Sequence, residues 1–519
     1  MRKWGPLIAI CLGAFVLLVD VTIVNVALPS MARDLGASFA SLQWVIDAYA
    51  LALAALLLAA GAFADRYGHR RAYVGGLALF AAASLVCGLA PDVGVLVAAR
   101  AVQGIGGAAM FATAPALLLA SYRGRDRGTA FGLWGATNGA AAAAGPLLGG
   151  VLTQHISWPA IFWVNLPVAA VAVVLTRRVM VTDRPAAAGR KNRVDVLGAA
   201  TFTVAAGALT YGLIRGAEDG WGTAATRLSF TVAALALVGF VAVEHRIARR
   251  GNSPMLDLTL LRNPSFTGLM TGAFLLQAGA FGCLALVSLW LQSLVGLSPV
   301  RAGLALTPLA AASFIVSVVA GRYIQRLSPR RPIGLGLLLV AAGMLLLSAG
   351  MTEGASAASL TWGLVVTGVG VGLATPVLVS AATSTVPPQR AGMAGGAVNT
   401  ARQSGMTLAI AVLGAAFANR ATATLTAGGL PRAGAAADAL ASGRANGMIA
   451  SAPAGQRAAA ADLAHRAFAA GLDRVFLLSA LAAALGAVAV LLLVRPAAPA
   501  PGPGRTSGAA AEAPAPARS

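Results

Sequence analysis

From Gly61 to Arg71 the chain reads Gly-Ala-Phe-Ala-Asp-Arg-Tyr-Gly-His-Arg-Arg, a charged loop between two long apolar stretches. The second half of the chain echoes this loop from Gly321 to Arg331, as Gly-Arg-Tyr-Ile-Gln-Arg-Leu-Ser-Pro-Arg-Arg. A shorter pair of echoes starts at Arg127 and at Arg390. Equivalent loops on one side of a membrane indicate a parallel internal repeat, so the sequence predicts two related six-helix halves.

The rest of the sequence agrees with a membrane protein. The 519 residues are 58% hydrophobic and only 11% charged, whereas globular chains are about 25% charged. Apolar stretches of about 20 residues are typical of membrane-spanning helices. We predict an all-α protein with fourteen spans, two of them inserted between the halves, at residues 7–28, 44–64, 73–90, 94–120, 129–153, 160–176, 195–214, 228–247, 266–291, 302–321, 332–350, 357–382, 393–418 and 474–494.

The positive charges predict the orientation. The net charge of +21 could suggest a nucleic-acid partner, but the basic residues lie in short loops between apolar runs. Such loops are cytoplasmic in membrane proteins. The short loops on the opposite side hold few basic residues, namely Arg33, Arg215, Arg227 and Arg301. We therefore expect both termini in the cytoplasm, a multi-pass protein of the inner membrane, and no nucleic-acid partner.

The predicted domains follow from these spans. An N-terminal six-helix bundle covers residues 1–178, and two linker helices lie within 179–262. A C-terminal bundle covers 263–494 and includes an Ala/Gly-rich outer loop at 419–473, with room for a short helix. The Pro/Ala-rich tail at 495–519 is expected to be a disordered cytoplasmic segment.

The loop at 61–71 resembles the signature loop of the major facilitator superfamily. Other segments are similar to fourteen-helix drug:proton antiporters of that superfamily, and they lie at Leu18–Pro29, Gln43–Tyr49, Arg100–Gly107, Gly135–Gly150 and Trp158–Pro167. Pro159 departs from the family pattern, where a basic residue is expected, and Gln325 replaces the acid of the repeated loop. The resemblance implies a major-facilitator fold and exchange rather than uptake.

Three ionisable residues in or near spans are candidates for a proton relay: Asp20, Asp47 and Arg100. A charge inside the bilayer is costly, so it usually marks a transport pathway or a proton relay. At 1.5 Å per residue, Asp20 and Arg100 both lie about 10 Å from the outer face, and Asp47 is slightly shallower. Protonation of Asp20 would release Arg100. The alternatives are a permanent structural ion pair and, for Asp47, an interfacial helix cap.

Polar residues within spans are candidates to line a substrate cavity. Gln103 lies one turn from Arg100 and would either orient it or line the cavity. Arg402 is placed near mid-membrane, where a cation needs a partner or water. Interhelical hydrogen bonds explain the others equally well. The candidate cavity residues are Asn25, Gln103, Asn138, Gln277 and Arg402.

Two further motifs are candidates for gating. In the cytoplasmic loop, Asp65 could cap the next helix or pair with a basic residue across the cytoplasmic face, although the loop could serve orientation alone. Its candidate residues are Gly61, Asp65, Arg66, Gly68, Arg70 and Arg71. In the fifth span, small residues and a proline could form a hinge seam between the halves, or only a packing face. Its candidates are Gly135, Gly139, Gly145, Pro146, Gly149 and Gly150.

The favoured function is a proton-coupled antiporter that exports small hydrophobic drugs or antibiotics by alternating access. The resemblance implies a chain that works as a monomer without a cofactor, and a cationic substrate is left open. No His/Cys/carboxylate cluster has metal-ligand spacing, so we expect no metal. The alternatives are a proton-coupled transporter of another metabolite and, more distantly, a membrane-embedded enzyme or a lipid sensor. We expect no enzymatic activity, because no nucleophile–base constellation is apparent.

Overall fold

The structure is a computed structural model, and nearly all of it is helical. It describes residues 3–36, 39–180, 195–250, 254–323, 327–351, 355–387, 390–430, 432–441, 443, 445–450 and 453–495. No β-strand occurs within these ranges. Most of the tail at 495–519 lies outside them. The all-α fold predicted from the sequence is confirmed.

The helices follow the predicted order. The first half comprises α1 (Gly5–Leu35), α2 (Phe39–Tyr67), α3 (His69–Gly88), α4 (Val93–Ser121), α5 (Gly124–His155), α6 (Ala160–Trp163) and α7 (Asn165–Val179). Two linker helices follow, α8 (Val196–Asp219) and α9 (Ala224–Arg249). The second half comprises α10 (Pro264–Phe281), α11 (Leu284–Ser293), α12 (Pro299–Tyr323), α13 (Arg330–Ala349), α14 (Thr361–Ser384), α15 (Ala391–Ala427), α16 (Ala433–Ala441), α17 (Ala445–Ala450) and α18 (Arg457–Leu493).

Thirteen segments of the described chain are long and apolar enough to cross a membrane. Two of them are interrupted helices: α6 and α7 form one span, and α10 and α11 form another. Besides the short helices α16 and α17, the helix outside this set is α5, whose sequence is rich in glycine and polar residues. At 32 residues α5 is nevertheless long enough to span, and it packs between α1 and α12. With α5 included, the fourteen predicted spans are accounted for.

The contacts between helices confirm the internal repeat. In the first half α1 packs on α5 and α7, and α4 packs on α2 and α3. In the second half α10 packs on α15 and α18, and α14 packs on α12 and α13. The second pattern is the first one with each helix replaced by its repeat equivalent. The contacts between the halves obey the same rule, because α5 packs on α12 and α2 packs on α15.

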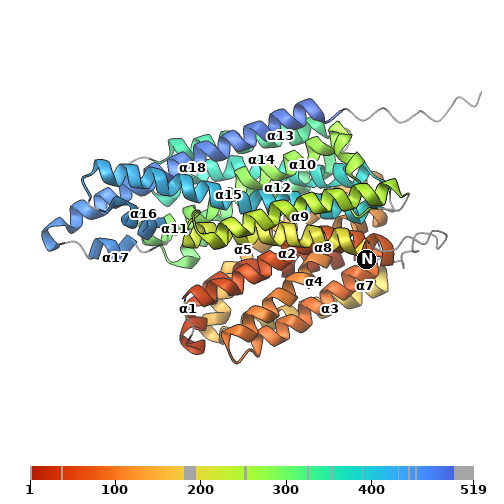
Figure 1. Cartoon of the computed structure of the whole chain (residues 1–519), viewed down its shortest axis with the longest axis horizontal. Coiled ribbons are helices and arrows are strands. Elements are labelled where there is room, and N and C mark those ends of the chain that lie inside the picture. Colours follow the sequence, from red (N-terminus) through yellow and green to blue (C-terminus); the bar gives the residue numbers. More distant parts are fainter. Residues whose placement is uncertain are drawn as a thin grey trace, which may run out of the picture.

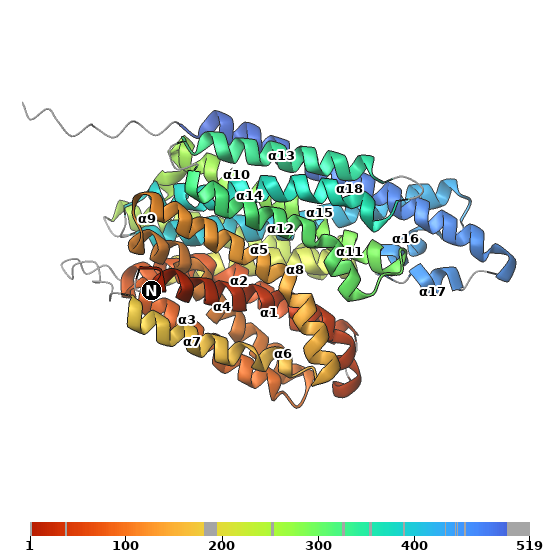
Figure 2. The same ribbon diagram turned by 180° about the vertical axis from the view of Figure 1, so that it is seen from behind.

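The two halves lie side by side, with the linker helices across one junction (Figure 1). The hairpin of α8 and α9 contacts α2 and α15, the pair that forms one of the two seams between the halves. Seen from behind, α5 and α12 lie on the opposite face (Figure 2). The start of α1 and the end of α18 lie at the same end of the molecule, which is called the terminal end below.

The segment from 419 to 473 differs from the sequence prediction. An outer loop with a short helix was expected there, but α15 continues to Ala427, α18 begins at Arg457, and α16 and α17 lie between them. Alanine has the highest helix propensity, so this Ala-rich sequence favours helix over loop. Buried side chains such as Leu440 and Phe468 fix the extensions to each other.

Candidate functional site

The Asp20 carboxylate is buried in the middle of the first half. Asp20 lies at the centre of α1, and its relative exposure is 0%. Arg100 lies on α4, and its relative exposure is 1%. The Arg100 Nη1 atom donates to Asp20 Oδ2 at 2.5 Å, so the two residues form a buried ion pair. The sequence predicted that these two charges share one depth, and the structure joins them directly.

Neutral side chains complete the environment of Asp20. The amide nitrogens of Gln103 and Asn165 donate to Asp20 Oδ1 at 2.9 Å and 2.8 Å. Both amides also donate to the hydroxyl of Ser84. A buried charge without such partners would be strongly unfavourable. Four helices, α1, α3, α4 and α7, therefore contribute to a single hydrogen-bond network around one carboxylate.

Arg100 is held from several directions. Its Nε atom donates to the Val45 carbonyl at 3.0 Å, and Nη1 also donates to Gln103 Oε1 at 2.7 Å. The guanidinium carbon lies 4.2 Å from the ring centroid of Tyr49 and 5.8 Å from that of Phe162. Such cation–π contacts stabilise a desolvated cation. The arginine thus connects the carboxylate to α2 and α6.

Glycines on α4 allow this close packing. A Cβ atom on Gly104 would lie 2.6 Å from the Tyr49 carbonyl oxygen, and one on Gly106 would lie 2.7 Å from the Phe80 nitrogen. Both distances are shorter than real Cβ contacts. The glycines after Arg100 therefore let α4 approach α2 on one face and α3 on another.

The three sequence candidates for the relay are all buried. Asp47 lies on α2, the helix that also provides Val45 and Tyr49 to Arg100. Gln103 orients Arg100, the first of the two roles considered for it. The sequence does not indicate a role for Ser84, because a single serine within an apolar run is common. Asn165 could have been identified from the sequence, because it is an amide at the start of an apolar run.

A second polar region lies between the two halves. Arg402 on α15 donates from Nε to Gln277 Oε1 on α10 at 3.3 Å. Its guanidinium carbon lies 5.9 Å from the ring centroid of Phe111 on α4, and that ring lies 6.3 Å from Trp134 on α5. Asn138 follows Trp134 by one helical turn. We call Arg402, Gln277, Phe111, Trp134 and Asn138 the central cluster.

Several polar atoms of the central cluster are buried without a hydrogen-bond partner among the described residues. They include Nη1 of Arg402, Nε1 of Trp134, and both amide atoms of Asn138. Most buried polar groups in proteins are paired, so such unpaired groups need an explanation. Water or a ligand between the halves would satisfy them. The side chain of Asn25, the remaining cavity candidate, lies outside the described part of the chain.

Asp65 joins the two halves at the terminal end. Its Oδ1 atom accepts a hydrogen bond from the Gly392 amide at 2.8 Å, and Oδ2 accepts one from the Met393 amide at 2.7 Å. The His69 ring nitrogen Nε2 lies 2.9 Å from Oδ1. Asp65 therefore caps a helix, as one alternative predicted, but that helix is α15 of the other half and not the next helix in sequence.

Glycines permit this contact too. A Cβ atom on Gly61 would lie 2.4 Å from the Gly392 carbonyl oxygen, and one on Gly392 would lie 2.6 Å from Asp65 Oδ1. Gly68 has φ of 101° at the start of α3, a conformation that favours glycine. The loop arginines lie at the end of α2, for Arg66, and at the start of α3, for Arg70 and Arg71. Gln325 of the repeated loop lies outside the described residues.

The candidate glycines of α5 lie on opposite faces of that helix. Cβ atoms on Gly145 and Gly149 would lie 1.8 Å from Thr22 Oγ1 and 2.9 Å from the Ile23 carbonyl oxygen, both on α1. Those on Gly135, Gly139 and Gly150 would lie 3.2–3.5 Å from atoms of α14 and α12. Thus α5 is packed more tightly against its own half than against the other. The side chain of Pro146 lies outside the described part.

The sequence did not predict the proximity of two acidic residues in the linker helices. Glu244 on α9, 1% exposed, and Asp195 at the start of α8 both approach Gly198, where a Cβ would lie 2.8 Å from Glu244 Oε1 and 2.2 Å from Asp195 Oδ2. Within the described residues no group of three or more His, Cys, Asp or Glu side chains is gathered for a metal ion.

Comparisons with known proteins agree with this arrangement. A sequence profile of the Major Facilitator Superfamily matches residues 10–410. The chain is 37% identical over 420 residues to the multidrug resistance protein Stp of Mycobacterium tuberculosis, covering 81% of this chain and 76% of that protein. It is 34% identical to the tetracenomycin C resistance and export protein of Streptomyces glaucescens, covering 96% and 92%. The crystal structure of the human organic anion transporter MFSD10 (TETRAN) superposes with a TM-score of 0.61 at 15% identity, covering 94% of this chain and 99% of that chain.

Proposed function

Since the chain belongs to the major facilitator superfamily, a family of multi-pass transporters of the cytoplasmic membrane, we propose that it exports small apolar drugs or antibiotics in exchange for protons. The buried Asp20–Arg100 pair is the observation that carries the proton-coupling part of this proposal. The relatives named for drug resistance and export support the substrate class. No catalytic constellation needs to be invoked, so we propose a transporter and not an enzyme.

The relay begins with the paired state that the structure contains. Three side chains donate hydrogen bonds to the Asp20 carboxyl group: Arg100, Gln103 and Asn165. A proton that binds Asp20 removes the charge that holds Arg100. The arginine then retains its contacts with Val45 and Tyr49 on α2 but loses its tie to α1. Deprotonation restores the pair, so the relay has two arrangements.

Helix α4 connects the relay to the central cluster. Phe111 follows Arg100 by eleven residues on the same helix, a distance of about 16 Å. Phe111 contacts Arg402 of the second half and Trp134 of its own half. A small displacement of α4 upon proton binding therefore changes the contacts of the central cluster. We propose that the substrate binds there, next to the unpaired atoms of Arg402, Trp134 and Asn138.

The chemistry of the central cluster limits the substrate. Its aromatic walls, Phe111 and Trp134, favour flat apolar molecules. Within the described residues, Arg402 bonds to the neutral Gln277 and to no carboxylate. An unneutralised arginine disfavours cations, so we propose neutral or weakly acidic substrates with an oxygen acceptor. This narrows the sequence-based expectation, which left a cationic substrate open.

The terminal end is proposed to be cytoplasmic, in accordance with the positive-inside rule. The Asp65 cap on α15 then closes the cytoplasmic side in the state seen here. Alternating access requires that this contact opens when the halves rock about their seams. The glycines of α5 and the close approach of Gly61 to Gly392 are the packing features on which that movement depends.

Reconstitution into vesicles tests the function. Purified protein in liposomes is given a pH gradient with protons outside, and export of a tetracenomycin-type aromatic and of a quaternary ammonium dye is followed by fluorescence. Gradient-dependent export that collapses with a protonophore supports the proposal. Uptake along with protons, or movement that ignores the gradient, contradicts it. Chemical conversion of the compound without a gradient would establish the enzyme alternative.

A further inference from the structure

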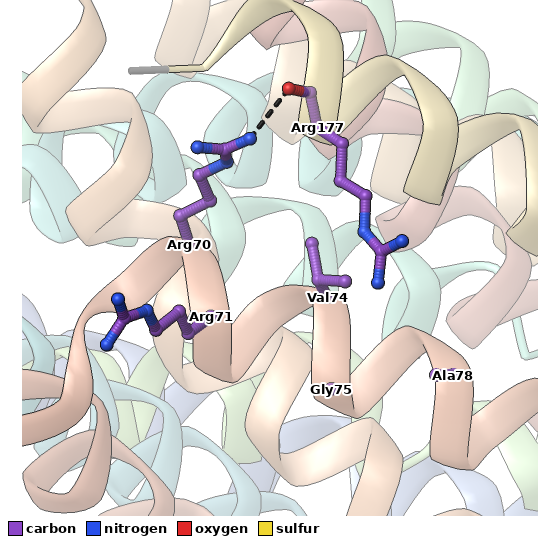
Figure 3. Close-up of a pocket in the computed structure, with 6 residues that line it drawn as sticks. All are labelled: Arg70, Arg71, Val74, Gly75, Ala78 and Arg177. Carbon is purple, nitrogen blue, oxygen red and sulfur yellow. Dashed lines mark hydrogen bonds between the residues drawn. The ribbon is translucent and has the colours of Figure 1, made fainter. Parts of the chain in front are cut away.

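Three arginines gather around a cavity at the terminal end of the first half. Arg70 and Arg71 lie at the start of α3, and Arg177 lies near the end of α7. They line a cavity of about 460 Å³ whose remaining walls are Val74, Gly75 and Ala78 of α3. In Figure 3 the Arg177 side chain reaches from its helix toward Val74, whereas Arg71 extends from the other side of α3. The cavity is therefore basic at its rim and apolar along the helix.

The arginine positions are fixed by the fold. Arg70 donates from Nη2 to the Arg177 carbonyl oxygen at 2.6 Å and so ties the start of α3 to the end of α7 (Figure 3). Arg71 and Arg177 are exposed, and no ion pair of either side chain occurs within the described ranges. The nearby Asp65 is engaged by the α15 amides and His69. Among the described residues, the side chains of Arg71 and Arg177 thus have no carboxylate partner.

A second cavity adjoins the first. It measures about 540 Å³ and shares Arg71 and Gly75 with the arginine-rich cavity. Its other walls are mostly apolar side chains of α2, α3, α4 and the start of α8, among them Leu56, Phe63, Leu79, Ile105 and Val196. A Cβ atom on Gly75 would meet nothing within 4 Å, so the shared wall is open space. Both volumes fall within the range of about 300–1,000 Å³ that small-molecule sites occupy.

We propose that the two cavities together bind one anionic phospholipid. The phosphate binds at the basic rim next to Arg177, and the acyl chains follow α3 through the two apolar cavities that meet at Gly75. Guanidinium groups are well suited to phosphate recognition. Basic pockets between helices at the cytoplasmic surface bind anionic head groups. A free phosphate ion would leave the apolar walls unused, and a neutral lipid would bring no net negative charge to Arg177.

Native mass spectrometry of the detergent-purified full chain tests the head-group contact. The probes are dioleoylphosphatidylglycerol and dioleoylphosphatidylcholine at equal concentration. Arg177→Ala is expected to weaken phosphatidylglycerol binding about fivefold, as expected for one surface arginine, and to leave phosphatidylcholine binding unchanged. The matched control is Arg178→Ala, because Arg178 is the next residue of α7 and is exposed but does not line the cavity. Equal losses in the two variants would mean diffuse surface attraction and would overturn the proposal.

A second variant tests the acyl-chain contact independently. Gly75→Leu adds a side chain at the wall that the cavities share, where a Cβ atom meets nothing within 4 Å, so retention of both lipids should fall several-fold while the apparent unfolding temperature stays unchanged. Gly414→Leu on α15 is the control, since a Cβ there also meets nothing within 4 Å. Retained binding in Gly75→Leu contradicts the acyl-chain assignment. Displacement of the lipid by inorganic phosphate at the same concentration would show a phosphate site instead.

Discussion

The Asp65 carboxylate of the first half lies 2.8 Å from the Gly392 amide of the second half and caps helix α15. Because a carboxylate at a helix N-terminus satisfies free amides and interacts favourably with the helix dipole, this contact stabilises the association of the two halves at the terminal end.

Removal of the cap should open the terminal end. Asp65→Ala is expected to shift the closed-to-open ratio about tenfold, since an N-terminal cap contributes about 1–2 kcal/mol. Spin labels on Arg66→Cys and Ser384→Cys, which lie at this end on opposite halves, report the opening by distance measurement. The control is Asp92→Ala, because Asp92 caps α4 through Val95 within one half. An unchanged distance distribution in Asp65→Ala would contradict a gating role.

Asp20→Asn should abolish proton-driven export but not insertion or substrate binding. The amide keeps the shape of the side chain and loses the charge that exchanges protons. Gradient-driven export in liposomes should fall at least a hundredfold, whereas exchange of substrate for substrate should persist. Asp34→Asn is the matched control, because Asp34 lies on the same helix and is exposed. Wild-type export by the Asp20 variant would remove this residue from the relay.

Arg100→Ala should destabilise the fold as well as impair transport. Loss of one partner of a buried ion pair costs about 3–5 kcal/mol, because the other charge remains without compensation. The apparent unfolding temperature in detergent should therefore fall, and the additional change Asp20→Asn should restore part of the loss. Arg227→Ala removes a charge near a helix end and should change neither property. Equal effects of the two arginine variants would indicate a general folding defect.

Gly145→Ala should be damaging and Gly150→Ala nearly neutral. The new Cβ at residue 145 would lie 1.8 Å from Thr22 Oγ1, whereas at 150 it would lie 3.5 Å from Val300. Overpacking typically costs about 1–3 kcal/mol. Unfolding temperature and export rate of the two variants measure the difference. Similar behaviour of both would mean that α1 and α5 can separate without cost.

The sequence predicts the all-α fold and the internal repeat, because the length of each apolar stretch and the repeated loop motifs are local features of the sequence. The span predicted at 129–153 corresponds to α5, although the many small residues of this helix give it a lower hydropathy than the other spans. The helical extensions within 419–473 are not predicted by the sequence. Alanine is only moderately apolar, so an Ala-rich segment indicates neither a loop nor a membrane span.

The sites were predictable only in part. Asp20 and Arg100 stand out as charges in apolar runs, and their shared depth follows from the helix rise. Ser84 does not stand out, since a serine in a membrane helix is common. The partner of Asp65 is a pair of backbone amides far along the chain, and no residue type or spacing encodes such a contact. Glu244 and Asp195 meet only because α8 and α9 fold into a hairpin.

The hairpin of α8 and α9 makes the two junctions between the halves differ in their access to the surrounding lipid. The seam between α2 and α15 is covered by α8, whereas the seam between α5 and α12 lies on the opposite face (Figures 1 and 2). A lipophilic molecule that moves laterally from the bilayer toward the protein therefore meets α8 at the junction of α2 and α15. At the other junction it meets α5 and α12 themselves. Although the two halves are related by an internal repeat, we therefore expect lateral entry of such a molecule at only one junction, the one between α5 and α12.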